Sequence, residues 1–241
     1  MPIERHKNYI HHHDSRVVAS IRELVFGLED GMVSTLGSIT GIAAATQNYF
    51  TVVLAGFVIV AVESISMAVG SYLSSKSERA IDERKIEEEK IELKKFPREE
   101  TEELIGMYVS DGWTPELARQ MADAAAWNKE LFLKEMAYRE LKIIPERMEN
   151  PFRNGVVMGV SYIVGGAIPI IPYFFAPLGM AITWSIGVTL AALFILWVAS
   201  GRYSGRTWWR AGFEMLGLAA MAAIIGYVVG QVVSSFIVRH G

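Results

Sequence analysis

The stretch TVVLAGFVIVAVESISMAVGSYLSSKSERAIDERKIEEEKIELKK, residues 51–95, decides the fold class. Its first half is apolar over a length that can cross a membrane, since an α-helix needs about 20 apolar residues to span about 30 Å of hydrocarbon. Its second half is mostly Glu, Lys, Arg and Asp. No helix breaker stands between Gly70 and Pro97, so we predict one helix that leaves the membrane and continues into water. At 1.5 Å per residue, residues 76–95 would extend it by about 30 Å.

The rest of the chain shows the same division between apolar and charged residues. Of its 241 residues, 51% are hydrophobic and 20% are charged. Residues 76–153 hold 34 of the 49 charged residues, and the remainder has the composition of a membrane protein. The chain has no Cys, which excludes disulfides and thiolate metal sites. A net charge of −3 without a basic stripe argues against a nucleic-acid partner.

Five apolar runs are long enough to cross a lipid bilayer. They cover residues 23–46, 51–75, 154–174, 177–200 and 209–238. We therefore predict an all-α integral membrane protein with five transmembrane helices and a cytoplasmic three-helix insertion between helices 2 and 3. The predicted parts are an N-terminal tail at 1–22, transmembrane helices 1 and 2 at 23–75, a cytoplasmic helical domain at 76–153 and transmembrane helices 3 to 5 at 154–241.

Lys and Arg set the predicted orientation, because positively charged loops tend to stay in the cytoplasm. The N-terminal tail and the segments 76–153 and 201–210 are rich in them, whereas the loops at 46–51 and 175–177 have none. We expect the N-terminus and residues 76–153 in the cytoplasm and the C-terminus on the far side. The first span lacks a small-residue cleavage site, so we expect that it is not a signal peptide.

Local signals predict the helices of the charged segment. One helix follows Pro97 and ends near Asp111, Thr114 and Pro115 are typical of the start of another, and a further helix runs from about Asn128 to Ile144. We expect these helices to share a small apolar core, formed by Leu104, Tyr108, Trp113, Leu117, Met121, Trp127, Leu131 and Leu141.

Acids inside the apolar runs are the first functional signal, because a carboxylate in hydrocarbon is costly and marks an ion path or a partner. We place Asp30 and Glu63 at one depth, about 12 Å from the cytoplasmic boundary, and Met67 lies one turn after Glu63. Two carboxylates and a thioether suit a borderline transition metal better than Na⁺ or Mg²⁺. The alternative is a helix-packing face with hydrogen-bonded acids. Glu23 and Glu214 are expected only to reach the membrane interface.

A second group of acids lies in the charged segment. Spacings of three or four residues put pairs of them on one helix face. Three such faces can converge on one carboxylate-rich site with a sulfur ligand, formed by Glu89, Glu92, Glu100, Glu103, Met136 and Glu140. The alternative is a set of solvated helix faces with intrahelical ion pairs.

Three segments resemble one known family. They are LEDGMVST at 28–35, SISMAVG at 64–70 followed by YLSSKSE at 72–78, and GGAIP at 165–169. These segments are similar to those of the vacuolar iron transporter family, and the resemblance runs from Glu23 to the fifth span. It implies five spans per subunit, a homodimer with the ion path between its subunits, and exchange of Fe²⁺ or Mn²⁺ for protons.

The resemblance also implies roles for single residues. Asp30 and Met67 would line the path, and the six residues of the charged segment would bind metal, with Ala137 standing where the family often has a second Met. Family members carry the acid of the second span at the position of Ile59 or Ser71. Here Glu63 lies on about the same face, and we assign that role to it.

We therefore expect a transporter that moves Fe²⁺ or Mn²⁺ out of the cytoplasm, and not an enzyme. No prosthetic group is expected, and Fe²⁺, Mn²⁺ or Zn²⁺ would be substrate or bound ligand. The membrane would be the cell membrane in a prokaryote and the vacuolar membrane in a eukaryote.

One alternative function is that of a membrane-anchored ferroxidase with its metal site in the cytoplasmic helices. Di-iron sites usually include His, however, and every His lies at 6, 11, 12, 13 or 240. Another is a scaffold whose glutamates only solubilise the insertion. The His11–His13 run is either a weak metal-collecting tail or incidental.

Overall fold

The computed structural model describes residues 20–46, 48–145, 148–204, 217, 220–233 and 235, and it gives no account of the side chains of residues 201–204. In these ranges the secondary structure is helical, with turns and no strand. The chain divides into two compact units, the first formed by residues 1–72 with 152–241 and the second by residues 73–151. His11–His13, Glu214 and most of the loop 201–210 lie outside the described residues.

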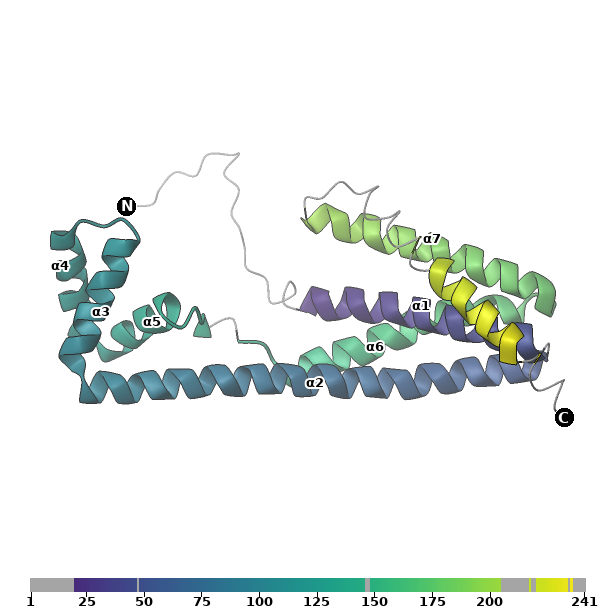
Figure 1. Ribbon diagram of the computed structural model, residues 1–241, viewed down its shortest axis with the longest axis horizontal. Coiled ribbons are helices and arrows are strands. Elements are labelled where there is room, and N and C mark those ends of the chain that lie inside the picture. The colour runs from purple at the N-terminus through teal and green to yellow at the C-terminus, as the bar shows by residue number, and fades with distance from the viewer. Residues whose placement is uncertain are drawn as a thin grey trace, which may run out of the picture. The chain divides into compact units, whose positions relative to one another are not determined.

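The first unit contains the apolar helices. They are α1 (Ile21–Thr46), the first part of α2 (Tyr49–Lys95), α6 (Pro151–Ile170) with the 3₁₀ turn η3 (Ile171–Phe174), α7 (Leu178–Ser204) and a helix at Ala220–Val233, yellow in Figure 1.

Three helical stretches of the described chain are long and apolar enough to cross a membrane. They are Tyr49–Lys95, Pro151–Phe174 and Leu178–Ser200, while Ala220–Val233 is apolar but shorter. They correspond to the second, third and fourth predicted spans. Helix α1 is 26 residues long but less apolar, because Glu23, Glu29 and Asp30 lie in it. The count of five spans therefore stays a prediction.

Glycines let α1 lie very close to two neighbouring helices. A Cβ atom on Gly27 would be 2.8 Å from the carbonyl oxygen of Met158 in α6, and a Cβ atom on Gly41 would be 2.5 Å from that of Gly226. Any larger residue at these positions would push the helices apart. Helix α1 also packs against α7, where Met32 and Leu193 are buried together. It thus lies among α6, α7 and the helix Ala220–Val233 (Figure 1), and this packing sets the surroundings of Asp30.

The second unit contains the later part of α2 with α3 (Pro97–Ser110), α4 (Pro115–Ala126) and α5 (Lys129–Arg139). The predicted starts of α3 and α4 are confirmed, and the Thr114 side chain accepts a hydrogen bond from the Leu117 amide. The prediction that the last helix continues to Ile144 is wrong. The chain leaves the helix after Arg139, because Lys142 adopts a left-handed conformation with φ of 57° and the chain turns there before the buried Ile143.

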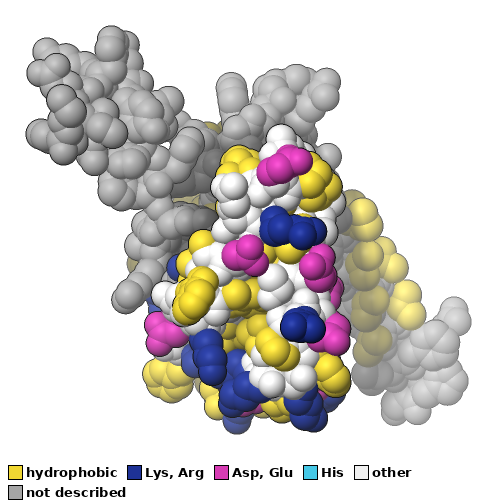
Figure 2. Space-filling model, turned by 90° about the vertical axis from the view of Figure 1, so that its left-hand side faces the viewer, with side chains coloured by type: hydrophobic (Ala, Val, Ile, Leu, Met, Phe, Trp, Pro, Cys, Tyr) yellow, Lys and Arg dark blue, Asp and Glu magenta, His cyan; other side chains and the backbone are white. Residues whose placement is uncertain are grey.

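The core of the second unit differs from the predicted one. Leu104 and Tyr108 are buried as expected, but Trp127 is 92% exposed, and Trp113, Leu117 and Leu131 are exposed as well. Three alanines of α4 are buried instead, together with two large residues of α5. These residues are Ala118, Ala122, Ala125, Phe132 and Met136. The alanines of α4 let this helix approach its neighbours closely, so its alanine face points inward. The surface of this unit in Figure 2 mixes acidic, basic and apolar side chains.

Candidate metal-binding sites

Three of the predicted cytoplasmic ligands converge in the second unit. Glu89 comes from α2, Glu100 from the first turn of α3 and Glu140 from the C-cap of α5. One carboxylate oxygen from each lies within 4.8 Å of the other two. The helix break at Phe96, before Pro97, turns the chain between Glu89 and Glu100 (Figure 1), so acids from successive helices meet. We call these three residues the carboxylate cluster.

Two members of the carboxylate cluster are deeply buried. Glu89 is 2% exposed and Glu100 is 7% exposed, whereas Glu140 is exposed. Within the described chain, Oε1 of Glu89 and Oε2 of Glu100 are buried and have no hydrogen-bond partner. A buried carboxylate is costly unless it is paired or bound to a cation. The cluster is thus a group of three acids that is open to solvent on the side of Glu140.

Burial and mutual repulsion favour the protonated form of these acids. Burial, followed by the negative charges of Glu140 and Glu100, raises the pKa of Glu89 to about 8. Burial also raises the pKa of Glu100, and the pKa of Glu140 is raised by partial desolvation and then by the charge of Glu103. At neutral pH the carboxylate cluster therefore retains protons that a metal ion would have to displace.

The other three predicted ligands, Glu92, Glu103 and Met136, are not members of the carboxylate cluster. Glu92 and Glu103 are exposed, and their charges act on Glu100 and Glu140. Met136, one turn before Glu140, is completely buried and packs in the core with Leu104. In the structure, the two glutamates thus act on the cluster through their charges, and Met136 packs in the core. That these three residues bind metal stays a prediction.

The acids predicted to lie in the membrane are neighbours in the first unit. The negative charge of Glu63 in α2 acts on Asp30 in α1, and both act on Tyr162 in α6. The Tyr162 hydroxyl shares a hydrogen bond with Ser34. Asp30 and Met67 are half-buried, whereas Glu63 is exposed on the surface of the single chain. Two acids that are distant in sequence thus form one charged region next to a buried tyrosine.

Glu23 is expected at the membrane interface, which stays a prediction, but the structure buries this side chain within the protein. Its side chain is 2% exposed. Arg22 donates a hydrogen bond of 2.8 Å to one carboxylate oxygen, and the other oxygen has no hydrogen-bond partner within the described chain. The sequence signal for this burial is the spacing of Glu23 and Asp30. Residues seven apart lie on one face of a helix, and Asp30 follows Glu23 by seven, so both acids lie on the same side of α1.

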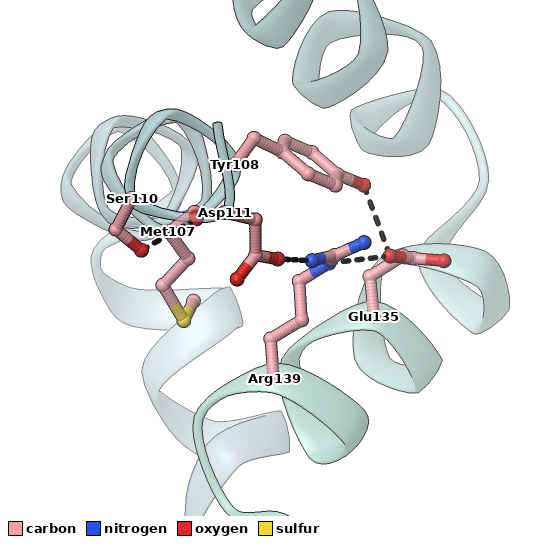
Figure 3. Close-up of polar contacts among 6 residues, drawn as sticks. All are labelled: Met107, Tyr108, Ser110, Asp111, Glu135 and Arg139. Carbon is pink, nitrogen blue, oxygen red and sulfur yellow. Dashed lines mark hydrogen bonds and ion pairs between the residues drawn. The ribbon is translucent and has the colours of Figure 1, made fainter. Parts of the chain in front are cut away.

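A polar network that the sequence did not reveal ties α5 to the end of α3 (Figure 3). The Tyr108 hydroxyl and Arg139 Nε both donate to Oε2 of Glu135, each at 3.0 Å. The Arg139 Nη1 atom pairs with Asp111, and the guanidinium lies 4.3 Å from the centroid of the Tyr108 ring. Only the spacing of Glu135 and Arg139 is visible in the sequence, since Tyr108 and Asp111 lie on another helix.

Long apolar helices in one unit and an acidic helical bundle in the other define a multi-pass membrane protein. Within this class, residues 21–231 match the VIT family, and the chain belongs to that family. The family resemblance seen in the sequence motifs is therefore confirmed.

Proteins similar to this chain cover nearly its whole length. Vacuolar iron transporter 1 of Arabidopsis thaliana is 28% identical over 226 residues, which cover 92% of this chain and 90% of that protein. Vacuolar iron transporter 1 of Tulipa gesneriana is 26% identical over 238 residues, covering 97% and 96%. Vacuolar iron transporter 2 of Oryza sativa subsp. japonica is 27% identical over 216 residues, covering 89% and 88%.

Proposed function

We propose that this protein moves Fe²⁺ out of the cytoplasm in exchange for protons, with Mn²⁺ as a second substrate. The similar proteins are named iron transporters, which supplies the metal. The observation that carries the proposal is the carboxylate cluster, in which three acids from three helices present oxygen atoms within 4.8 Å of one another. Carboxylate oxygens bind divalent first-row metals, and Zn²⁺ would bind them too.

Capture of the metal is the first proposed step. A divalent ion offsets the repulsion among Glu89, Glu100 and Glu140 and gives the buried oxygens of Glu89 and Glu100 the partner they lack within the described chain. Glu92 and Glu103 add negative potential and Met136 a soft donor, so we retain all three in the proposed binding domain at 76–153. Because the cluster retains protons, metal binding releases protons to the cytoplasm.

Passage through the membrane is the second proposed step. Asp30, Glu63 and Met67 receive the ion, and protons from the far side then compete for the same carboxylates, which couples metal export to proton entry. Glu63 is exposed on the single chain, which supports a homodimer in which the path is completed by a second subunit. The N-terminus and the binding domain face the cytoplasm, and the membrane is the cell membrane in a prokaryote or the vacuolar membrane in a eukaryote.

Transport into proteoliposomes tests the proposal. With Fe²⁺ kept reduced outside and a fluorescent metal indicator inside, the wild type should accumulate Fe²⁺ only when a pH gradient is present. Asp30→Asn should lose most of this rate. Glu89→Gln should lose rate mainly at low metal concentration, because it weakens capture. Glu88→Gln is the matched control, since the neighbouring Glu88 is exposed and paired with Arg84. Normal gradient-driven uptake by Asp30→Asn would contradict the proposed path.

Iron oxidation at the same cluster is the alternative function. Three carboxylates from three helices are also a plausible ligand set for iron chemistry, although the cluster itself contains no His. The purified protein in detergent, given Fe²⁺ and O₂, distinguishes the two functions. Fe²⁺ oxidation above the protein-free rate that Glu89→Gln abolishes, together with no uptake into proteoliposomes, would favour the oxidase.

A further inference from the structure

Two basic residues adjoin members of the carboxylate cluster in the chain, and both are engaged elsewhere. Lys90, next to Glu89, pairs with Glu87, and the side chain of Arg139, next to Glu140, makes three contacts away from the cluster. It donates to Glu135, pairs with Asp111 and lies over the Tyr108 ring (Figure 3). Only 18% of its side chain is exposed. All three contacts are on the side of α5 that faces the C-terminal end of α3.

Arg139 and Glu140 are adjacent in the chain, yet they reach toward opposite ends of α3. Glu140 meets Glu100 in the first turn of that helix, whereas Arg139 meets Asp111 at its C-cap. Eleven residues separate Glu100 from Asp111, which is about 16 Å along a helix at 1.5 Å per residue. The guanidinium is thus drawn away from the carboxylates that its neighbour joins.

The charges with the largest effects on the carboxylate cluster are acidic. They are the charges of Glu89, Glu100 and Glu140 on one another, together with those of Glu92 and Glu103. An arginine stays protonated at every physiological pH and binds carboxylates in a bidentate manner, so a free guanidinium beside Glu140 would be a permanent competitor for a metal ion.

We propose that Asp111 and Glu135 hold Arg139 away from the carboxylate cluster, so that the binding position is kept for a divalent cation. Asp111 and Glu135 are positioning residues in this arrangement, since they act through Arg139. The inference rests on the proposed function, in which the cluster captures the metal. It predicts that the two acids matter for affinity because of the arginine they restrain.

Mn²⁺ binding to the full-length protein in detergent tests this inference, with free Mn²⁺ measured by electron paramagnetic resonance. The double variant Asp111→Asn with Glu135→Gln keeps the shapes of both side chains and releases Arg139. Its Mn²⁺ affinity at the cluster should fall by roughly five- to tenfold, the scale of one ordinary hydrogen bond made by the competing guanidinium. Adding Arg139→Gln to the double variant should restore the affinity to within about threefold of the wild type.

Two further variants separate this role from a structural one. Arg139→Gln alone should lower the melting temperature, since it removes the contacts to Tyr108, Glu135 and Asp111, yet its Mn²⁺ affinity should equal or exceed that of the wild type. Tyr108→Phe removes a hydrogen bond to Glu135 but leaves Arg139 restrained, so its affinity should not change. If the double variant does not fold, Asp111→Asn alone gives the smaller change of the same sign, because Asp111 is at the surface.

The outcomes are distinguishable. A triple variant as weak as the double variant, or a double variant with wild-type affinity, would overturn this inference while leaving the capture site intact. Mn²⁺ binding that Glu89→Gln does not weaken would overturn both the capture site and the inference. Loss of Mn²⁺ affinity in the double variant, with recovery in the triple variant, supports the inference about Arg139. A merely structural network would not be repaired by removing one more of its members.

Discussion

Glu89 is an acid in a position where the charged form is unfavourable. It is 2% exposed, and the charges that act most strongly on it are those of Glu140 and Glu100. A packing role would be filled better by Leu or Gln at this position, because one buried oxygen of Glu89 has no hydrogen-bond partner among the described residues. A bound metal ion would offset both the burial and the repulsion, so we propose Glu89 as the centre of the capture site.

The pH dependence of stability provides a test at the scale of this residue. The pKa of Glu89 is about 8 in the folded protein against an ordinary 4.5, so its contribution to stability is present below pH 4.5 and is lost as the pH rises through 8. Without metal, the second unit should therefore become less stable between these values. Hydrogen exchange of peptides from α3 and α5, corrected for the intrinsic pH dependence and measured with a chelator present, should show this loss of protection.

Glu89→Gln should flatten that dependence, whereas Glu88→Gln should leave it unchanged. Saturating Mn²⁺ at pH 8 should restore protection in the wild type, because the metal replaces the lost protons. Equal pH dependence in the wild type and in Glu89→Gln would contradict the shifted pKa.

At the scale of the element, α5 connects the core of the second unit to the carboxylate cluster. Its N-terminus is capped by Asn128, whose side chain accepts hydrogen bonds from the Glu130 and Leu131 amides at 3.1 and 3.2 Å. Its C-terminal end presents Arg139 to α3 and Glu140 to the carboxylate cluster. The position of the last ligand therefore depends on a helix of only 11 residues, too short to be stable without its tertiary contacts.

Removing the cap should loosen the start of α5. Asn128→Ala should cost about 1 kcal/mol, because two amides lose their acceptor, whereas Asn128→Gly should cost only a few tenths of that. Hydrogen exchange at residues 129–134 should accelerate by roughly fivefold in the alanine variant, the equivalent of that energy. Exchange in the alanine variant that equals that of the wild type would show that the Asn128 side chain does not cap the helix.

At the scale of the whole molecule, the close approach of α1 to its neighbours organises the first unit. A Cβ atom on Gly31 would collide with the carbonyl oxygen of Tyr162 and lie 2.8 Å from the Gly166 amide. These contacts involve backbone atoms, which cannot rotate away as a side chain can. Because Asp30 directly precedes Gly31, the same packing fixes the position of the proposed path residue.

Gly31→Ala should therefore destabilise the protein by roughly 1–3 kcal/mol, the usual cost of overfilling a packed core. Gly106→Ala is the matched control, because a Cβ atom there meets nothing within 4 Å and alanine favours a helix. The apparent melting temperature in detergent should fall in the first variant and stay or rise in the second. An unchanged value for Gly31→Ala would contradict the contact between α1 and α6.

Much of the fold follows from local signals in the sequence. The apolar run and charged continuation of α2, the break before Pro97, and the Thr114 cap with Pro115 all determine where helices begin and end, because they act through neighbours in the chain. The acid pairs of the capture site were also visible as residues sharing a helix face. The early end of α5 was not, since it depends on a turn at Lys142 that leads into the buried Ile143.

The sequence by itself determined that this is a helical membrane protein of the VIT family with an acidic helical segment, since apolar length, charge and motifs are properties of the chain alone. Only the tertiary structure decided which acids meet. Helical spacing places residues on one face but does not set how that face is turned toward another helix. That rotation brings Glu89, Glu100 and Glu140 together, buries Glu23 and Met136, and directs Arg139 toward Asp111 rather than toward the carboxylate cluster.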